Sequence, residues 1–218
     1  MIDYIIKPKD DIIDDRFFGR HFQIKYNKKE HEYFLKDLGQ GYGTFFKINK
    51  WVEIKNNFLI SIGENYIVIT LGSKDDMLIN ENNTNDETFE NSINLKIFSS
   101  NIRHGNLSFT PQQSPFIIGR SQDCDVIIDD NMLSRFHCCI EYRNDKWFIT
   151  DGYIDNNNIK RSTNGTWIYA FDDTLITNGM IFQLDDILSQ CVDIVGTHSL
   201  NKAGDEGVET VQFLGSSP

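Results

Sequence analysis

The sequence predicts an all-β protein made of two antiparallel β-sandwiches joined by an acidic linker. Two observations support this prediction. The apolar runs are short and bounded by Asn, Asp and Gly, and the 218 residues include 16 Phe and 8 Tyr, a composition typical of strands. Blocks of sequence from the first half also recur in the same order in the second half, which indicates two copies of one domain.

The repeat consists of four aligned pairs, each an apolar run with similar flanking residues. The pairs are "YIIKPKDDIIDDRFFGRHFQIKY" from Tyr4 with "FIIGRSQDCDVIIDDNMLSRFHCCIEY" from Phe116, "YFLKD" from Tyr33 with "WFITD" from Trp147, "GYGTFFKI" from Gly41 with "TNGTWIYA" from Thr163, and "NNFLISIGENYIVIT" from Asn56 with "NGMIFQLDDILSQCVDIV" from Asn178. Four matches in one order are hard to attribute to chance.

Each block of the second copy is a strand candidate. The expected strands are 116–118, 126–128, 138–142, 147–150, 166–169, 180–184 and 191–195, preceded by "INLKIFS" from Ile93. No amphipathic helix separates them, so an antiparallel sandwich is expected. The first copy has no obvious equivalent of the strand at Ile93.

These blocks predict four segments of the chain. Residues 1–71 form a degenerate sandwich whose N-terminal strand is missing, and residues 72–92 form an acidic, Asn-rich linker with little to bury. Residues 93–196 form the second sandwich. Residues 197–218 form a tail, in which residues 208–214 are a possible extra strand.

The charge and the apolar runs exclude some classes of partner. A net charge of −11 disfavours nucleic acid and anionic membranes, which are bound through clustered Lys and Arg. No apolar run of about 18 residues and no signal-peptide pattern occurs. We therefore expect an intracellular protein, cytoplasmic or nuclear, that binds neither nucleic acid nor a membrane.

The four cysteines do not form a metal site. Cys124, Cys138, Cys139 and Cys191 include no CxxC pair, and neighbours in a strand point to opposite faces. The adjacent acids Asp129 and Asp130 are more typical of a capped or solvated turn than of a metal pair. We expect reduced thiols, no metal and no other cofactor.

Three short motifs follow one another in the second copy: "GR" at Gly119, "SRFH" at Ser134 and "STNGT" at Ser162. In this order they resemble the forkhead-associated (FHA) domain, a β-sandwich that binds phosphothreonine peptides through loops at one end. The resemblance extends from Ile93 to about Val195. It implies two sandwiches of the FHA type, the first of them degenerate.

A phosphate ester carries about two negative charges and three acceptor oxygens, so its receptor needs fixed donors and a permanent cation. Arg120 supplies a planar guanidinium that can bind two oxygens at once. Ser134 offers a hydroxyl and a backbone amide, and Arg135 adds a second cation. We assign these three residues to the phosphate.

The resemblance implies roles for the remaining site residues. Asn164 would hydrogen-bond the main chain of the ligand, and Thr163 would help close the pocket. His137 would brace the loops, and Gly119 and Gly165 would allow the turns that present their neighbours. Lys160 and Arg161, in the long stretch before Thr163, extend the basic rim and lie where specificity is expected.

A catalytic pairing of Ser134 with His137 is disfavoured, because no third residue is evident to orient the histidine. The first copy keeps Arg20, His21, Gly43 and Thr44, but Gly19 stands in place of the serine and Tyr42 in place of the asparagine. "KPKD" stands where "GRSQ" is expected, and Lys7 or Lys9 would offer only a point charge in place of the guanidinium. We expect that this copy has lost phosphopeptide binding.

The leading hypothesis is therefore a non-catalytic phosphothreonine reader that joins a phosphorylated partner protein. A second hypothesis is a scaffold subunit of an intracellular assembly that uses both sandwiches as phosphate-independent surfaces. A third is that the chain is the targeting part of a larger signalling protein, such as a ubiquitin ligase or a kinase. No motif of a catalytic centre favours an enzyme.

Overall fold

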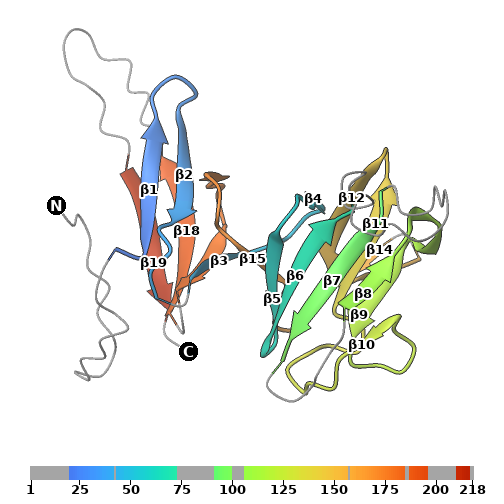
Figure 1. Cartoon of the computed structure of the whole chain (residues 1–218). Helices are drawn as coiled ribbons and strands as arrows, with labels where there is room; N and C mark the ends of the chain where they lie inside the picture. The colour runs from blue at the N-terminus through green and yellow to red at the C-terminus, as the bar shows by residue number, and fades with distance from the viewer. Residues whose placement is uncertain are drawn as a thin grey trace, which may run out of the picture. The chain divides into compact units, whose positions relative to one another are not determined.

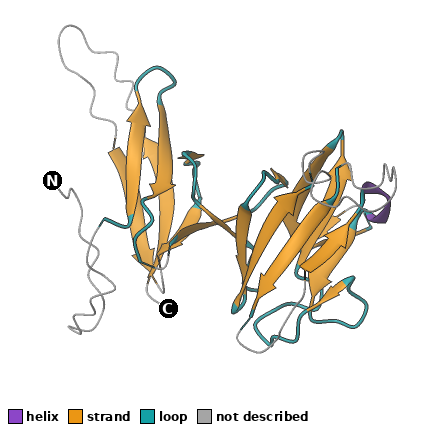
Figure 2. Cartoon of the chain, viewed as in Figure 1, coloured by secondary structure: helices purple, strands orange, loops and turns teal. Residues whose placement is uncertain are grey.

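The computed structural model describes residues 20–41, 43–72, 91–99, 106–156 and 158–184, together with the backbone of 187–195 and 210–216. Strands dominate this part of the chain, and a short 3-10 turn, η4 (Pro111–Gln113), is the helical element that it contains (Figure 2). The expectation of an all-β fold is confirmed.

The chain forms two compact units, and neither is a consecutive half of the sequence. We call Lys47–Ile168 the site unit. Met1–Phe46 and Tyr169–Pro218 together make the terminal unit, which contains both ends of the chain. The chain thus passes from one unit to the other twice.

The site unit is a β-sandwich. Its first sheet has the order β10-β9-β11-β12-β4, and the other sheet contains β15-β5-β6-β7-β8 (Figure 1). A separate hairpin pairs β13 with β14. The bounds are β4 (Val52–Glu53), β5 (Phe58–Ile62), β6 (Asn65–Leu71), β7 (Ile93–Phe98), β8 (Asn106–Phe109), β9 (Phe116–Gly119), β10 (Val126–Ile127), β11 (Cys138–Arg143), β12 (Lys146–Asp151), β13 (Tyr153–Asp155), β14 (Asn158–Lys160) and β15 (Trp167–Tyr169).

Alternating side chains of both sheets build the core of this sandwich. Ile118 and Ile140 from the first sheet and Ile67 and Leu95 from the second are fully buried. In β7 the pattern is strictly alternate, with every second residue buried, as expected for a sheet with one face covered. The apolar periodicity of β7 therefore indicates which of its faces points inward.

The hairpin of β11 and β12 shows how turn residues set the register. Asn144 and Asp145 both adopt positive φ, 50° and 59°, which is the conformation of a two-residue type I′ turn. Six residue pairs follow from Arg143↔Lys146 to Cys138↔Asp151. This register delivers Asp151 and Gly152 to the end of the sandwich where the predicted site residues lie.

The terminal unit contains two groups of strands. The first sheet has the order β1-β2-β16, and a second run has the order β19-β18-β17-β3. The bounds are β1 (Phe22–Asn27), β2 (Glu32–Asp37), β3 (Thr44–Lys47), β16 (Thr174–Leu175), β17 (Ile181–Leu184), β18 (Ile187–Val195) and β19 (Thr210–Ser216). Tyr33, Leu35, Ile176 and Phe182 form its buried apolar cluster.

Some sequence expectations lie outside the described residues. These are the first strands of copy one, before residue 20, and the linker from 73 to 90. Strand β19 lies where the extra strand at 208–214 is expected. The expected strands of the second copy match β9 to β12, β15, β17 and β18 to within a few residues.

Candidate functional site

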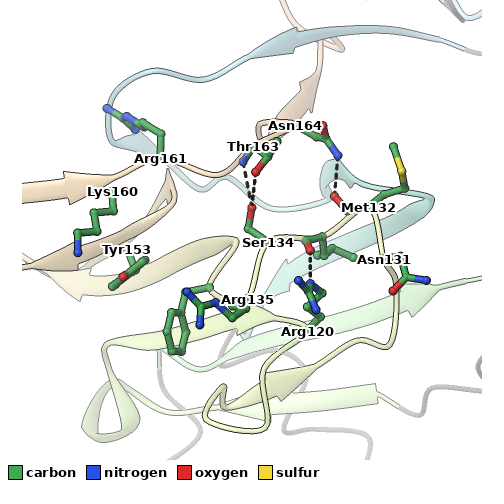
Figure 3. Close-up of a pocket in the computed structure, with 12 residues that line it drawn as sticks. Arg120, Asn131, Met132, Ser134, Arg135, Tyr153, Lys160, Arg161, Thr163 and Asn164 are labelled. Atoms are coloured by element: carbon green, nitrogen blue, oxygen red, sulfur yellow. Dashed lines mark hydrogen bonds between the residues drawn. The ribbon is translucent and has the colours of Figure 1, made fainter.

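Loops at one end of the site unit enclose a polar pocket of about 390 Å³. The loops that follow β9, β10 and β14 supply its walls (Figure 3). The pocket is lined by Arg120, Asn131, Met132, Leu133, Ser134, Arg135, Phe136, Tyr153, Lys160, Arg161, Thr163 and Asn164. All five predicted phosphopeptide-binding residues are in this set.

Arg120 leaves the end of β9 and is held from two directions. Its backbone N–H donates to Ser134 O (3.2 Å) and its Nε donates to Leu133 O (2.9 Å). These bonds fix the plane of the guanidinium and leave its two terminal nitrogens for a ligand. A Cβ on the preceding residue, Gly119, would lie 2.3 Å from Arg135 O, so glycine is required for this close approach.

Ser134 and Thr163 join two of the loops. The Thr163 backbone N–H donates to Ser134 Oγ (2.9 Å), and Ser134 Oγ lies 3.4 Å from Thr163 Oγ1 (Figure 3). The two hydroxyls therefore lie at one point of the pocket wall. Arg120 and Arg135 are both exposed, and a guanidinium that faces solvent is free to meet an anion.

His137 is fully buried beneath these loops. Its Nδ1 accepts a hydrogen bond from the Ser134 backbone N–H (3.1 Å), so the ring proton lies on Nε2, which donates to Gly165 O (3.0 Å). Burial lowers the pKa of His137 below 6.5, which agrees with a neutral ring. One side chain thereby links the serine loop to the loop that carries Asn164.

The geometry also argues against a Ser134–His137 catalytic pair. The imidazole contacts the backbone N–H of Ser134, whereas the Ser134 hydroxyl accepts from Thr163. A general base needs a hydrogen bond to the hydroxyl that it activates. The arrangement instead fits a bracing role for the histidine.

Asn164 lies at the mouth of the pocket, with its Nδ2 donating to Met132 O (2.7 Å) and its backbone O accepting from Trp167 Nε1 (3.1 Å). Within the described part of the chain no partner is seen for its Oδ1. The next residue, Gly165, adopts φ +86°, a conformation that favours glycine.

A buried network that the motifs did not reveal supports this loop. Asp151 accepts from Ser162 Oγ (2.6 Å), Ser162 N (3.1 Å) and Thr166 Oγ1 (3.0 Å), and Ser162 Oγ accepts from Gly165 N (2.8 Å). The aligned blocks "YFLKD" and "WFITD" already showed an aspartate retained at this position. The presence of this aspartate in both copies is the sequence feature that could have indicated a structural role for Asp151.

The two basic residues expected at the rim line the pocket, but other groups engage them. Arg161 donates to Thr150 Oγ1 (3.2 Å), to Asp151 O (3.1 Å) and to Asn49 O. Lys160 forms an ion pair with Asp155. Both side chains add positive charge to the rim, while Arg161 also ties the loop to the sandwich beneath it.

Asp130 acts as a local acceptor. Its Oδ1 accepts from Met132 N (2.7 Å), and its Oδ2 accepts from Glu64 N (2.9 Å) and Asn65 Nδ2 (2.7 Å). Within the described residues, no group of three or more His, Cys, Asp or Glu has the arrangement of a metal site. Cys124, Cys138 and Cys139 are buried free thiols, and burial raises the pKa of each.

The aligned residues of the first copy that the structure describes are Arg20, His21, Gly43 and Thr44. Arg20 N donates to Gln40 Oε1 (2.7 Å), and His21 Nδ1 lies 3.2 Å from Gln40 O. Gly43 has φ +87°, close to that of Gly165. The substituted positions Gly19 and Tyr42, and the lysines of "KPKD", lie outside the described residues.

Comparison with known proteins adds one finding for this part of the chain. The model of the FHA domain family matches residues 116–189, which include the loops that line the pocket. FHA domains are non-catalytic modules that mediate phosphothreonine-dependent protein–protein interaction. A search of curated proteins and a search of solved structures each returned no match. Across the described residues, no helix has the length and apolarity needed to span a membrane.

Proposed function

We propose that the pocket of the site unit binds phosphothreonine in a partner protein and that Arg120, Ser134 and Arg135 bind the phosphate. The observation that carries this proposal is the charge of the wall. Of the 12 residues that line the pocket, four are basic and none is acidic, although the whole chain has a net charge of −11. A dianionic phosphate fits such a site.

The remaining lining residues fit the main chain of a peptide. Asn164, at the mouth, has an amide oxygen able to accept from a backbone N–H. Thr163 and Ser134 bring two hydroxyls to the wall beside the arginines. Gly119, His137 and Gly165 support the loops and do not touch the ligand.

Binding of a degenerate phosphothreonine peptide library to the full chain tests this function. Arg120→Ala is expected to weaken binding about 10- to 100-fold, because hydrogen bonds to charged groups contribute about 1.5–3 kcal/mol. Lys146→Ala is the matched control, since this exposed lysine begins β12 at the end opposite Asp151. Equal affinity of wild type and Arg120→Ala would contradict the assignment.

We further propose that the terminal unit is a degenerate FHA copy without phosphopeptide binding. Matching backbone features support it, among them the positive φ of Gly43 and Gly165. The sequence supports the loss, since Gly19 and Tyr42 stand where serine and asparagine are needed. Tyrosine has no amide with which to hydrogen-bond a peptide main chain.

The partners expected are phosphothreonine proteins inside the cell, in the cytoplasm or nucleus. A scaffold subunit with phosphate-independent surfaces is the competing function. Partners that co-purify with the chain and leave after phosphatase treatment support the reader. Partners that remain bound support the scaffold.

A further inference from the structure

The site unit is completed by strands from the first half of the chain. Residues 47–71, which include β4, β5 and β6, belong to it, whereas residues 169–195 belong to the terminal unit. The FHA match, at 116–189, therefore extends 21 residues beyond the end of the site unit at Ile168 (189 − 168 = 21). Part of the matched sequence lies in the other unit.

The two chain passages fall at equivalent positions of the repeat. In the aligned blocks "GTFFKI" and "GTWIYA", the boundary between Phe46 and Lys47 matches the boundary between Ile168 and Tyr169. The strands that follow each boundary are the aligned blocks from Asn56 and Asn178. Each half thus keeps its first strands and contributes its last strands to the other unit.

The pairing of β4 and β16 matches in detail. In the site unit β4 pairs with β12 through Phe148↔Glu53, and Ile54 N donates to Trp147 O (2.8 Å). In the terminal unit β16 pairs with β2 through Leu175↔Phe34, and Ile176 N donates to Tyr33 O (2.8 Å). The paired residues occupy equivalent positions of the repeat in both units. In each unit the two paired strands come from different halves of the chain: β4 from the first half pairs with β12 from the second, and β16 from the second half pairs with β2 from the first.

The exchanged hairpin β5–β6 reaches the phosphate-binding loops through its turn. Asn65, 1% exposed, donates from Nδ2 to Asp130 Oδ2 (2.7 Å), and Glu64 N donates to the same oxygen (2.9 Å). A Cβ on Gly63 would lie 2.3 Å from that oxygen, so the turn fits closely against Asp130. In the second half the aligned turn residues are Asp185, Asp186 and Ile187, two of them acidic.

Asp130 connects the exchanged turn to the predicted ligand-binding side chains through further hydrogen bonds. Its Oδ1 and its backbone O accept from Met132 N (2.7 Å) and Leu133 N (3.0 Å). Met132 O in turn accepts from Asn164, and Leu133 O accepts from Arg120 Nε. Three hydrogen bonds in series therefore link the exchanged turn to each of two predicted ligand contacts, Asn164 and Arg120.

We propose that the two halves of the chain exchange their C-terminal strands, residues 47–71 for 169–195, and that Asn65 of the exchanged turn positions the phosphothreonine site through Asp130. The role of Asn65 rests on the proposed phosphothreonine binding, whereas the exchange itself does not.

Engineered cysteine pairs test the exchange without any ligand. Residues directly opposite in an antiparallel pair have Cα atoms about 4.5–5.5 Å apart, within the range of a disulfide. Glu53→Cys with Phe148→Cys is expected to oxidise within one chain, scored as a monomer with a cross-linked peptide by mass spectrometry. Leu175→Cys with Phe148→Cys, the pair predicted for unexchanged halves, is expected to stay reduced. The reverse result, or a disulfide between chains, would overturn the exchange.

Asn65→Ala tests the positioning role, with Asn56→Ala as its matched control. Asn56 lies at the other end of the same hairpin, where its Oδ1 accepts from Leu71 N (3.0 Å). Both variants remove a hydrogen bond that supports the hairpin, so a lowered Tm is expected in each. Only Asn65→Ala is expected to weaken phosphopeptide binding, about 10-fold, in protein verified as folded by circular dichroism.

Equal affinities of the two variants would overturn the role of Asn65. If the wild-type chain binds no phosphothreonine peptide, the proposed function fails and the role of Asn65 fails with it. The disulfide result still decides the exchange in that case.

Discussion

The loops beneath the pocket and the aligned loops of the terminal unit have similar backbone conformations, as at Gly165 and Gly43. They differ in the hydrogen bonds that their buried polar side chains make. Asp151 accepts three hydrogen bonds from Ser162 and Thr166. Asp37, aligned with Asp151, accepts from Gly39 N (2.7 Å) and Tyr169 OH (2.6 Å). Its Oδ2 has no partner among the described residues.

The two histidines differ in their burial. His137 is fully buried and uses both ring nitrogens to join two loops, whereas His21 is half-buried. A buried polar network holds a loop in one conformation only when its members are satisfied. The comparison shows that the Asp151 carboxylate and both ring nitrogens of His137 are hydrogen-bonded beneath the pocket.

The largest difference is expected from removing the two histidines. His137→Ala leaves Ser134 N and Gly165 O without their partner, so a loss of about 3 kcal/mol in unfolding free energy and of phosphopeptide binding is expected. His21→Ala is expected to cost less than about 1 kcal/mol, because this side chain is partly solvated. Urea denaturation measures both, and similar costs would remove the distinction.

A matched pair of threonines sharpens the comparison. Thr166 and Thr44 are aligned and both are fully buried. Thr166 Oγ1 donates to Asp151 Oδ1 (3.0 Å), whereas Thr44 Oγ1 has no partner among the described residues. Thr166→Val is expected to cost about 1–2 kcal/mol, and Thr44→Val is expected to be neutral or stabilising. Thermal unfolding of the two variants measures this, and a larger cost for Thr44→Val would refute it.

The smallest expected effect is a pH dependence. Burial lowers the pKa of His137, so below about pH 6.5 the unfolded chain takes up a proton that the folded chain excludes. Stability from this group is complete above pH 6.5 and falls as the pH decreases, by at most about 1.4 kcal/mol per pH unit. Urea midpoints from pH 7.5 to 5 and NMR titration of the His137 ring measure it. Titration of His137 above pH 6.5 would contradict the assignment.

Much of the local structure could be predicted from the sequence. The aligned apolar blocks predicted the positions of β9 and β11. The short strand β8 and the hairpin β13–β14 were missed because "NLSF" and "YID" contain too few apolar residues for a period to show.

The exchange of strands could not be predicted from local patterns. The block at Asn56 and the block at Asn178 carry the same alternation, so either fits the same gap in a sandwich. What distinguishes them is tertiary, such as the fit of Gly63 against Asp130. For the same reason the sequence predicted Arg120 and Ser134, which both line the pocket, but not the hydrogen bonds of Arg161 to Asn49 and Thr150.

The membership of residues 47–71 in the site unit has an evolutionary consequence under the proposed exchange. Selection then acts differently on the two parts of the first half of the gene. Its early loops are free to drift once they bind no ligand, whereas its last strands stay constrained by a function that belongs to the second half. Under this exchange, the first half cannot be deleted even after it has lost its own binding activity, because the site unit needs residues 47–71 to complete its fold.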